Sequence, residues 1–263
     1  MRKLVAIGIV LAMGCGSSGA EEQAAPPAAP ATAAPTPAPA PPEASAEVCA
    51  AVIVVAWQGA EHAPATVTRT ESDARARAEE LRTRAEAGED FAALARAESD
   101  AASSGPRGGL LGTYTREDWP AAHEPIREPI WNLREGEISE ALRAPYGWVV
   151  ARRCAVEHVH TRHVLIRFAG ARNAGPEITR TREEAQALAQ QVFAQASTPG
   201  SDFAALAREH SEDGSAERGG DLGVTGRGRL SAPYEAAAYG LALNAVSPPV
   251  ESDFGFHVIQ RVE

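Results

Sequence analysis

The sequence predicts an α+β fold made of two tandem domains, each a small antiparallel four-stranded sheet with helices packed on it. A pattern of about 110 residues occurs twice along the chain, which is too long for a solenoid unit and fits two copies of one globular domain. The second copy reads as a strand, helices, a strand, a helix and two strands. The 263 residues, of which 44% are apolar, are enough for two such domains with hydrophobic cores.

The first fifteen residues are typical of an export signal. Arg2 and Lys3 form a basic start, residues 4–13 are apolar, and small residues lead to Cys15. Ten apolar residues are too few to span a bilayer. The surroundings of Cys15 resemble the cleavage site of bacterial lipoproteins, so we expect this cysteine to become the lipidated first residue. The alternative is an ordinary signal peptide, because Ala12 stands where lipoproteins usually have an aliphatic residue.

Residues 16–47 separate this leader from the first copy. Within them, residues 24–42 are almost entirely Ala, Pro and Thr, a composition that cannot build a core and predicts an extended tether. Removing the leader makes the net charge of −10 more negative, which argues against nucleic acid and anionic headgroups as partners. We therefore expect membrane attachment to come from lipid alone.

Four pairs of segments define the repeat, and they predict domains over residues 48–156 and 157–263. The matched pairs are residues 88–99 with 200–211, 106–112 with 217–223, 124–139 with 232–247, and 144–153 with 252–261.

The second copy shows its elements most clearly. Thr181 and Glu184 form a capping box before a helix, and Ser201 is expected to cap the next one. We expect the helices to gather on one side of the sheet. The other expected elements are strands over 161–168 and 254–262, a helix over 202–210, a short strand after the glycine-rich turn 218–223, and a helix over 233–241.

Five motifs in the second copy resemble the parvulins, the PpiC-type peptidyl-prolyl cis/trans isomerases. They are RHVLI (162–166), DFAALAREHSED (202–213), RGGDLG (218–223), PYEAAAYGL (233–241) and FGFHVIQRV (254–262). Each motif alone is weak, but their order and spacing match over residues 160–263. The resemblance implies isomerisation of the bond before proline, a reaction that needs no metal, cofactor or covalent step.

The resemblance also implies a site. In parvulins two histidines on adjacent central strands face a Cys or Asp, and these positions are His163, His257 and Asp213 here. The proline pocket maps onto Leu222, Leu230 and Tyr234, with the hydroxyl of Ser252 near the histidines. An aspartate is charged at neutral pH, so we expect an electrostatic role for it and not a nucleophilic one. The alternatives are that the histidines are core residues and that Asp213 is a turn or cap residue.

The sequence argues against a metal site and against a phosphate-binding site. His158, His160 and His163 suggest a metal cluster, but alternation along a strand turns His163 to the opposite face, so we expect no metal. The phosphate-selective parvulins have a dense basic cluster after the first strand. Here only Arg167 and Arg172 stand there, so we expect no phosphate selectivity.

The first copy has lost the polar residues of this site. Val52 and Val149 take the histidine positions, Ala101 stands near the aspartate position, and Leu110 replaces Asp221. The glycines of the turn remain. We therefore expect an inactive parvulin-like domain.

Cys49 and Cys154 are expected to pair in an oxidising compartment, because they lie near strands that are antiparallel neighbours in parvulins. With Val52 opposite Val149, the two cysteines would miss direct opposition by two residues. The alternative is two buried unpaired thiols.

The sequence thus predicts an exported, lipid-anchored isomerase at the outer membrane, facing the periplasm, since Gly16 replaces the Asp that retains many lipoproteins at the inner membrane. Its partners would be unfolded or extended polypeptides that contain proline. The main alternative is a noncatalytic holdase that binds unfolded chains in both apolar grooves, and a further one is a structural lipoprotein of the envelope.

Overall fold

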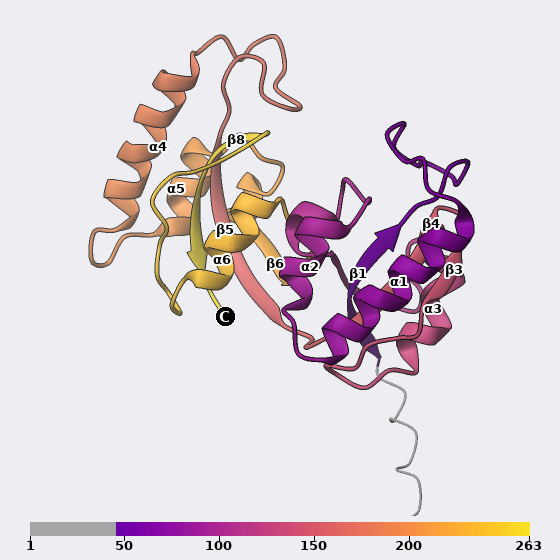
Figure 1. The fold of residues 1–263 in the computed structure, drawn as a ribbon. Coiled ribbons are helices and arrows are strands. Elements are labelled where there is room, and N and C mark those ends of the chain that lie inside the picture. Colours follow the sequence, from indigo (N-terminus) through magenta and orange to yellow (C-terminus); the bar gives the residue numbers. More distant parts are fainter. Residues whose placement is uncertain (1–45) are drawn as a thin grey trace, which may run out of the picture. The chain divides into compact units, whose positions relative to one another are not determined.

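The computed structural model describes residues 46–263, which form two four-stranded antiparallel sheets (Figure 1). The strand orders are β2-β1-β4-β3 and β6-β5-β8-β7, so the same α+β topology occurs twice, as predicted. The strands are β1 Glu47–Val55, β2 Leu110–Thr115, β3 Leu142–Ala144, β4 Gly147–Cys154, β5 His158–Ile166, β6 Asp221–Gly226, β7 Val250–Ser252 and β8 Gly255–Arg261. The predicted leader with Cys15, and the tether up to residue 45, lie outside the described residues, and Glu47, the last residue of the predicted tether, already belongs to β1.

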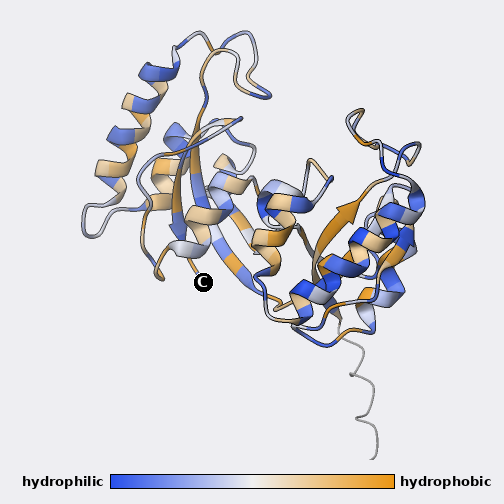
Figure 2. Cartoon of the chain, in the orientation of Figure 1, coloured by the Kyte–Doolittle hydropathy of each residue, from blue (hydrophilic) through white to orange (hydrophobic). Residues whose placement is uncertain are grey.

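Helices cover both faces of each sheet, so the expectation that they gather on one side is wrong. In the first copy α1 and α2 pack on one face and α3 on the other; α4, α5 and α6 repeat this arrangement in the second copy. The α-helices are α1 Glu71–Glu86, α2 Phe91–Glu98, α3 Glu124–Trp131, α4 Arg182–Ala196, α5 Phe203–His210 and α6 Ala232–Gly240. The central strand β1, which Figure 2 shows as apolar, has eight of its nine residues buried, because a strand covered on both faces is apolar on both.

The helix starts follow the predicted capping rules with one difference. Thr181 and Glu184 form the expected capping box at the start of α4. The next helix, α5, is capped by Asp202, whose carboxylate accepts the N–H of the third helical residue at 3.1 Å. Ser201, the predicted cap, instead donates to the carbonyl of Ala196. Across residues 46–263, no helix is both long enough and apolar enough to cross a membrane.

A disulfide joins Cys49 on β1 to Cys154 on β4, with a Cα–Cα distance of 5.0 Å. The two cysteines lie directly opposite each other, so the expected two-residue misalignment is wrong. Val149 lies opposite Val54 and not opposite Val52. The positions that correspond to the two site histidines are therefore diagonal neighbours, which shifts the register by two residues from the one assumed.

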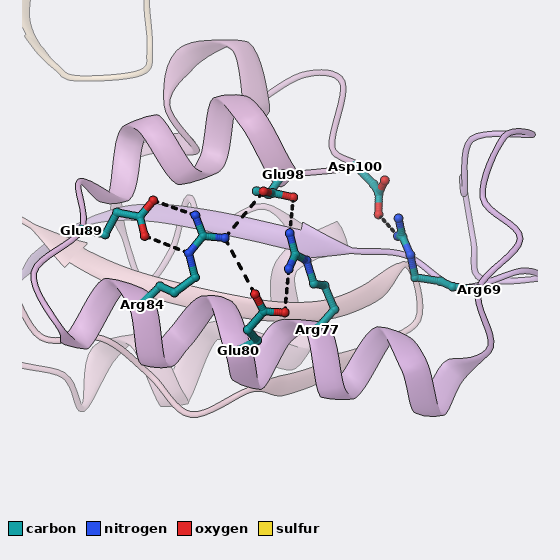
Figure 3. Close-up of polar contacts among 7 residues, drawn as sticks. All are labelled: Arg69, Arg77, Glu80, Arg84, Glu89, Glu98 and Asp100. Carbon is teal, nitrogen blue, oxygen red and sulfur yellow. Dashed lines mark hydrogen bonds and ion pairs between the residues drawn. The ribbon is translucent and has the colours of Figure 1, made fainter.

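Ion pairs join α1 to α2 in the first copy (Figure 3). Arg77 contacts Glu80 and Glu98, each at 2.6 Å. Arg84 contacts Glu89 at 2.7 Å and Glu98 at 3.6 Å. The carboxylate of Glu98, on α2, thus binds two arginines of α1.

Candidate functional site

Two histidines lie side by side at the centre of the second sheet. His163 on β5 and His257 on β8 are each only 4% exposed, and their rings stack with centroids 5.4 Å apart. The two Nδ1 atoms are 3.1 Å apart, within hydrogen-bond distance. Because His257 lies opposite Leu165 in the ladder, the two rings meet diagonally between neighbouring strands.

A polar side chain contacts each outer end of this pair. Nε2 of His163 lies 3.2 Å from Oδ1 of Asp213, and this buried nitrogen has no well-aligned hydrogen-bond partner. Nε2 of His257 lies 2.7 Å from Oγ of Ser252, which also accepts the N–H of Phe254. Four of the residues predicted from the sequence therefore form a continuous polar chain, Asp213–His163–His257–Ser252.

Donors and acceptors can be matched along this chain. A carboxylate only accepts, so Asp213 favours a proton on Nε2 of His163. With both rings neutral, Nδ1 of His163 then accepts from Nδ1 of His257, and Nε2 of His257 accepts from the hydroxyl of Ser252. This assignment follows from the partners of each atom. The tautomers of the two rings are consequently linked, and a change at one end of the chain affects the other.

Asp213 is an ionised carboxylate in this setting. The contact with His163 lowers its pKa well below the usual range, and the hydroxyl and N–H of Ser215, at 2.6 and 2.9 Å, lower it further against the opposing effect of burial. By binding Ser215, the side chain also shapes the turn before residues 216–218. Asp213 is thus both a neighbour of the histidine pair and a turn residue, the two roles that the sequence left open.

Burial lowers the pKa of His257 to about 3, and the electrostatic effects of the neighbouring His163 and Arg167 act in the same direction. The opposing effect of Asp213 does not compensate for them. His257 is therefore neutral at physiological pH, as the proton assignment above requires.

A cavity of about 280 Å³ opens beside the polar chain. Pockets for drug-sized ligands typically measure about 300–1,000 Å³, so this one suits a single side chain. The predicted pocket residues Leu222, Leu230 and Tyr234 line it, and His163, Asp213 and His257 form its polar end. The remaining lining residues are Leu165, Arg167, Asn173, Arg229, Ser231 and Phe254. Ser252 reaches the site through His257.

Tyr234 joins the apolar and polar parts of the site. Its ring meets both imidazoles edge to face, with centroids 5.6 Å from His163 and 5.2 Å from His257. Its hydroxyl donates to the buried Oγ1 of Thr161 at 3.0 Å, so its partner lies inside the domain. Burial raises the pKa of Tyr234 well above its usual range.

The glycine-rich turn before β6 holds the strand that bears His163. The carbonyl of Gly220 accepts the N–H of His163 at 2.9 Å. Gly220 has a φ of +76°, and a Cβ there would lie 2.2 Å from the His163 carbonyl oxygen. Only glycine allows this close approach. In the first copy Gly109 meets Val52 in the same way.

Two models of the PPIC-type PPIase domain match the chain, one over residues 59–154 and the other over residues 149–263. The chain belongs to the PPIC-type PPIase family. The first match covers the first copy from α1 to β4, without β1, and the second covers the whole of the second copy, so both copies are PPIC-type domains.

The chain is also similar to curated proteins named chaperones. Chaperone SurA of Albidiferax ferrireducens is 36% identical over 215 residues, which cover 76% of this chain and 44% of that protein. Chaperone SurA of Methylobacillus flagellatus is 31% identical over 212 residues, covering 77% and 45%. The chain thus spans less than half the length of these relatives. A solved peptidylprolyl isomerase, PrsA of Bacillus anthracis, is 28% identical with a TM-score of 0.32, covering 40% of each chain.

The first PPIC-type domain has a cavity in the same place, of about 380 Å³. Val52 and Leu111 line it at the positions of His163 and Leu222, and Ala101 lies near the position of Asp213. Val149, at the position of His257, is fully buried. The polar chain of the second PPIC-type domain is therefore replaced by apolar side chains.

Several residues of the PPIC-type site were not expected from the sequence. Thr161 could have been found, because it stands two residues before His163 and so on the same face of the strand. Ser215 gave no signal in the sequence. Glu212, which binds the backbone after β5, could have been found as well, since both copies have a serine and an acidic residue after the second helix, Ser211–Glu212 and Ser99–Asp100.

Proposed function

We propose that the second PPIC-type domain is a peptidyl-prolyl cis/trans isomerase that assists the folding of exported proteins. The observation that carries the proposal is the polar chain Asp213–His163–His257–Ser252 at the edge of an apolar cavity for one side chain. An apolar cavity suits a proline ring, and the buried polar groups suit an amide whose charge distribution changes as it twists.

Prolyl isomerisation requires the protein only to hold the proline ring and to favour the twisted amide. Rotation about a prolyl amide meets a barrier of about 18–20 kcal/mol because resonance stiffens the C–N bond. Leu222, Leu230 and Tyr234 would hold the ring while the preceding carbonyl turns. The carboxylate of Asp213 and the linked imidazoles would favour the twisted amide, in which this resonance is lost. No proton needs to be transferred.

The test is an isomerisation assay of the full chain with a short proline peptide. His163→Val with His257→Val introduces the residues of the first domain, and it should remove turnover above the spontaneous rate. Val149→Ala, at the matching position of the first domain, is the control and should retain activity. A double variant as active as the wild type would refute the proposal.

A second candidate function is that of a holdase. It is favoured by the apolar cavity in both domains and by the resemblance to proteins named chaperones. The same double variant separates the two functions, because a holdase would still suppress the aggregation of an unfolded client after the histidines are removed.

We further propose that the protein is exported and lipidated at Cys15, with unfolded or extended proline-containing chains as its partners. Selectivity for phosphate is not expected, because the guanidinium of Arg172 stacks on Phe254 and that of Arg167 donates to the carbonyls of Glu212 and Arg172.

The test of lipidation is the variant Cys15→Ala, which should move the protein from the membrane fraction to the soluble fraction. Unchanged membrane association would contradict lipidation at this residue.

A further inference from the structure

The segment after α5 is attached to the end of β5 by two successive side chains. Oγ of Ser211 accepts the N–H of Leu165 at 3.1 Å, and the Glu212 carboxylate accepts the N–H of Arg167 at 2.7 Å. The backbone adds a hydrogen bond from the N–H of Glu212 to the carbonyl of Leu165 at 2.9 Å. The next residue, Asp213, is the one whose carboxylate meets the histidine pair.

An arginine completes this attachment. Nη1 of Arg180 lies 2.6 Å from the Glu212 carboxylate and also donates to the carbonyl of Arg167 at 3.0 Å. Both side chains are partly buried, with exposed fractions of 30% for Arg180 and 23% for Glu212. We refer to Arg180, Glu212 and the backbone of Arg167 as the clasp. It closes the loop between β5 and α4, which carries the pocket residues Arg167 and Asn173.

The first domain contains the same clasp, although it lacks the site. The Asp100 carboxylate accepts the N–H of Ala56 at 2.9 Å and also binds Arg69 (Figure 3). Arg69 donates to the Ala56 carbonyl as well, at 2.9 Å. Oγ of Ser99 accepts the N–H of Val54, as Ser211 does for Leu165. The residue that follows Asp100, at the position of Asp213, is Ala101. The clasp is thus part of the framework of both domains, and only in the second is an acidic residue placed next to it.

We infer that Glu212 and Arg180 are positioning residues that hold Asp213 against His163. This inference rests on the proposed isomerase function of the site. The carboxylate of Asp213 is bound by Ser215, which belongs to the same loop, so these two bonds do not by themselves join Asp213 to β5. Its own N–H makes only a long bond, 3.4 Å, to Ser211. After Ser215 the loop is also tied to β5 through Gly220, whose N–H donates to the Ser215 carbonyl and whose carbonyl accepts the N–H of His163. The attachments of Ser211 and Glu212 to β5 directly precede Asp213 in sequence, so they fix the side of the loop from which its carboxylate reaches His163.

The repeat supplies a matched pair of variants. Glu212→Ala and Asp100→Ala each remove the clasp from one domain, so each should lower the unfolding midpoint of its own domain. In the full chain, Glu212→Ala should lower kcat/KM for a proline peptide about tenfold. The loss should appear mainly in kcat, because displacing the Asp213 carboxylate slows the reaction more than it weakens substrate binding. Asp100→Ala should leave kcat/KM unchanged.

Titration of the Asp213 carboxyl by ¹³C NMR separates positioning from electrostatics. The groups that face Asp213 are His163 on β5, His257 on β8, Tyr234 on α6 and Ser215 in its own loop. Removing the negative charge of Glu212 alone would lower the pKa of Asp213 further. Losing the contact with His163 would raise that pKa, and we expect this rise in Glu212→Ala.

The conservative variant Glu212→Asp should recover most of the activity and the low pKa, because the first domain builds its clasp with an aspartate. Arg180→Gln and Arg69→Gln form a milder matched pair if the alanine variants do not fold. Equal activity losses in the two members of a pair, or an Asp213 pKa that falls in Glu212→Ala, would overturn the inference. A wild-type chain without turnover would refute the proposed function instead, and the titration would still decide the positioning role.

Discussion

The first domain contains a disulfide and an ion-pair network, whereas the second contains the buried polar chain. At the positions of Arg77, Arg84 and Glu98, the second domain has Leu188, Gln195 and His210, so the network of α1 and α2 has no counterpart in α4 and α5. Conversely, the histidines of the second domain correspond to two buried valines in the first.

The difference indicates that stabilising features and site features have accumulated in different copies of one fold. A buried polar group stabilises a domain less than an apolar side chain that fills the same space, so a functional site commonly lowers the stability of its domain. The two domains share the strand order, the clasp and a capping box at the start of the first helix, Thr70 with Asp73 in α1 and Thr181 with Glu184 in α4. These shared parts form the framework to which the stabilising features and the site features were added. This separation can be tested domain by domain.

The largest expected effect is on the stability of the first domain. The disulfide closes a loop between residues 105 apart in sequence, and the chain-entropy model assigns about 4.7 kcal/mol to a loop of about 100 residues. Cys49→Ser with Cys154→Ser should therefore lower the unfolding midpoint of the first domain in denaturant. The midpoint of the second domain should stay the same. Reduction of the wild type should reproduce the result, and equal shifts in both domains would contradict the separation.

The next largest effect is on activity. Asp213→Ala removes the only carboxylate beside the histidine pair within the described site, and it should lower kcat/KM about 100-fold, or about 2.7 kcal/mol of transition-state stabilisation. Glu209→Ala, an exposed residue of the same segment, is the control. A fully active Asp213→Ala protein would leave the fold unaffected but remove the electrostatic role of the polar chain.

Acid should destabilise the second domain through His257. Its pKa is about 3 in the folded domain and about 6.5 when unfolded, so the unfolded state binds more protons between these values and stability falls as the pH is lowered through this window. From pH 7 to pH 5 the loss should be about 2 kcal/mol. His257→Val should remove this loss in denaturant unfolding measured at both pH values. Burial also lowers the pKa of His123 in the first domain. The stability of the first domain should therefore also fall as the pH is lowered.

The smallest effect concerns the ion pairs of α1 and α2. Glu98→Gln should lower the stability of the first domain by less than about 1 kcal/mol, because partly exposed ion pairs contribute little. The loss should shrink in 1 M salt, where charges are screened. His210→Gln, at the matching position, should show no such salt dependence. A loss that is independent of salt would indicate packing as its cause.

Much of the fold follows from local rules. The capping box of Thr181 and Glu184 and the repeat of motifs were sufficient to predict the helices and the tandem architecture. The site residues came together as predicted because each belongs to a motif whose place in the fold is fixed by its neighbours. Gly220 beside His163 is one example, since only glycine fits against the strand there.

What the sequence did not predict depends on tertiary packing. Burial on both sides of β1 required helices on both faces, and a pattern of apolar residues alone does not say which helix covers which face. The register of the first copy was wrong by two because Val52 and Val149, at the histidine positions, were assumed to be directly opposite, while side chains also meet diagonally. The partner of the Tyr234 hydroxyl, Thr161, lies 73 residues away in sequence, and only the folded sheet brings the two together.

The disulfide has a mechanical consequence. Cys49 lies near the start of β1 and Cys154 is the last residue of β4, so nearly the whole first domain lies within one covalent loop. A pulling force applied between the N-terminal segment and the second domain would pass through the sulfur atoms and bypass that loop. While the bond is intact, such a force would stretch and unfold the second domain, and the first would bear load only after reduction.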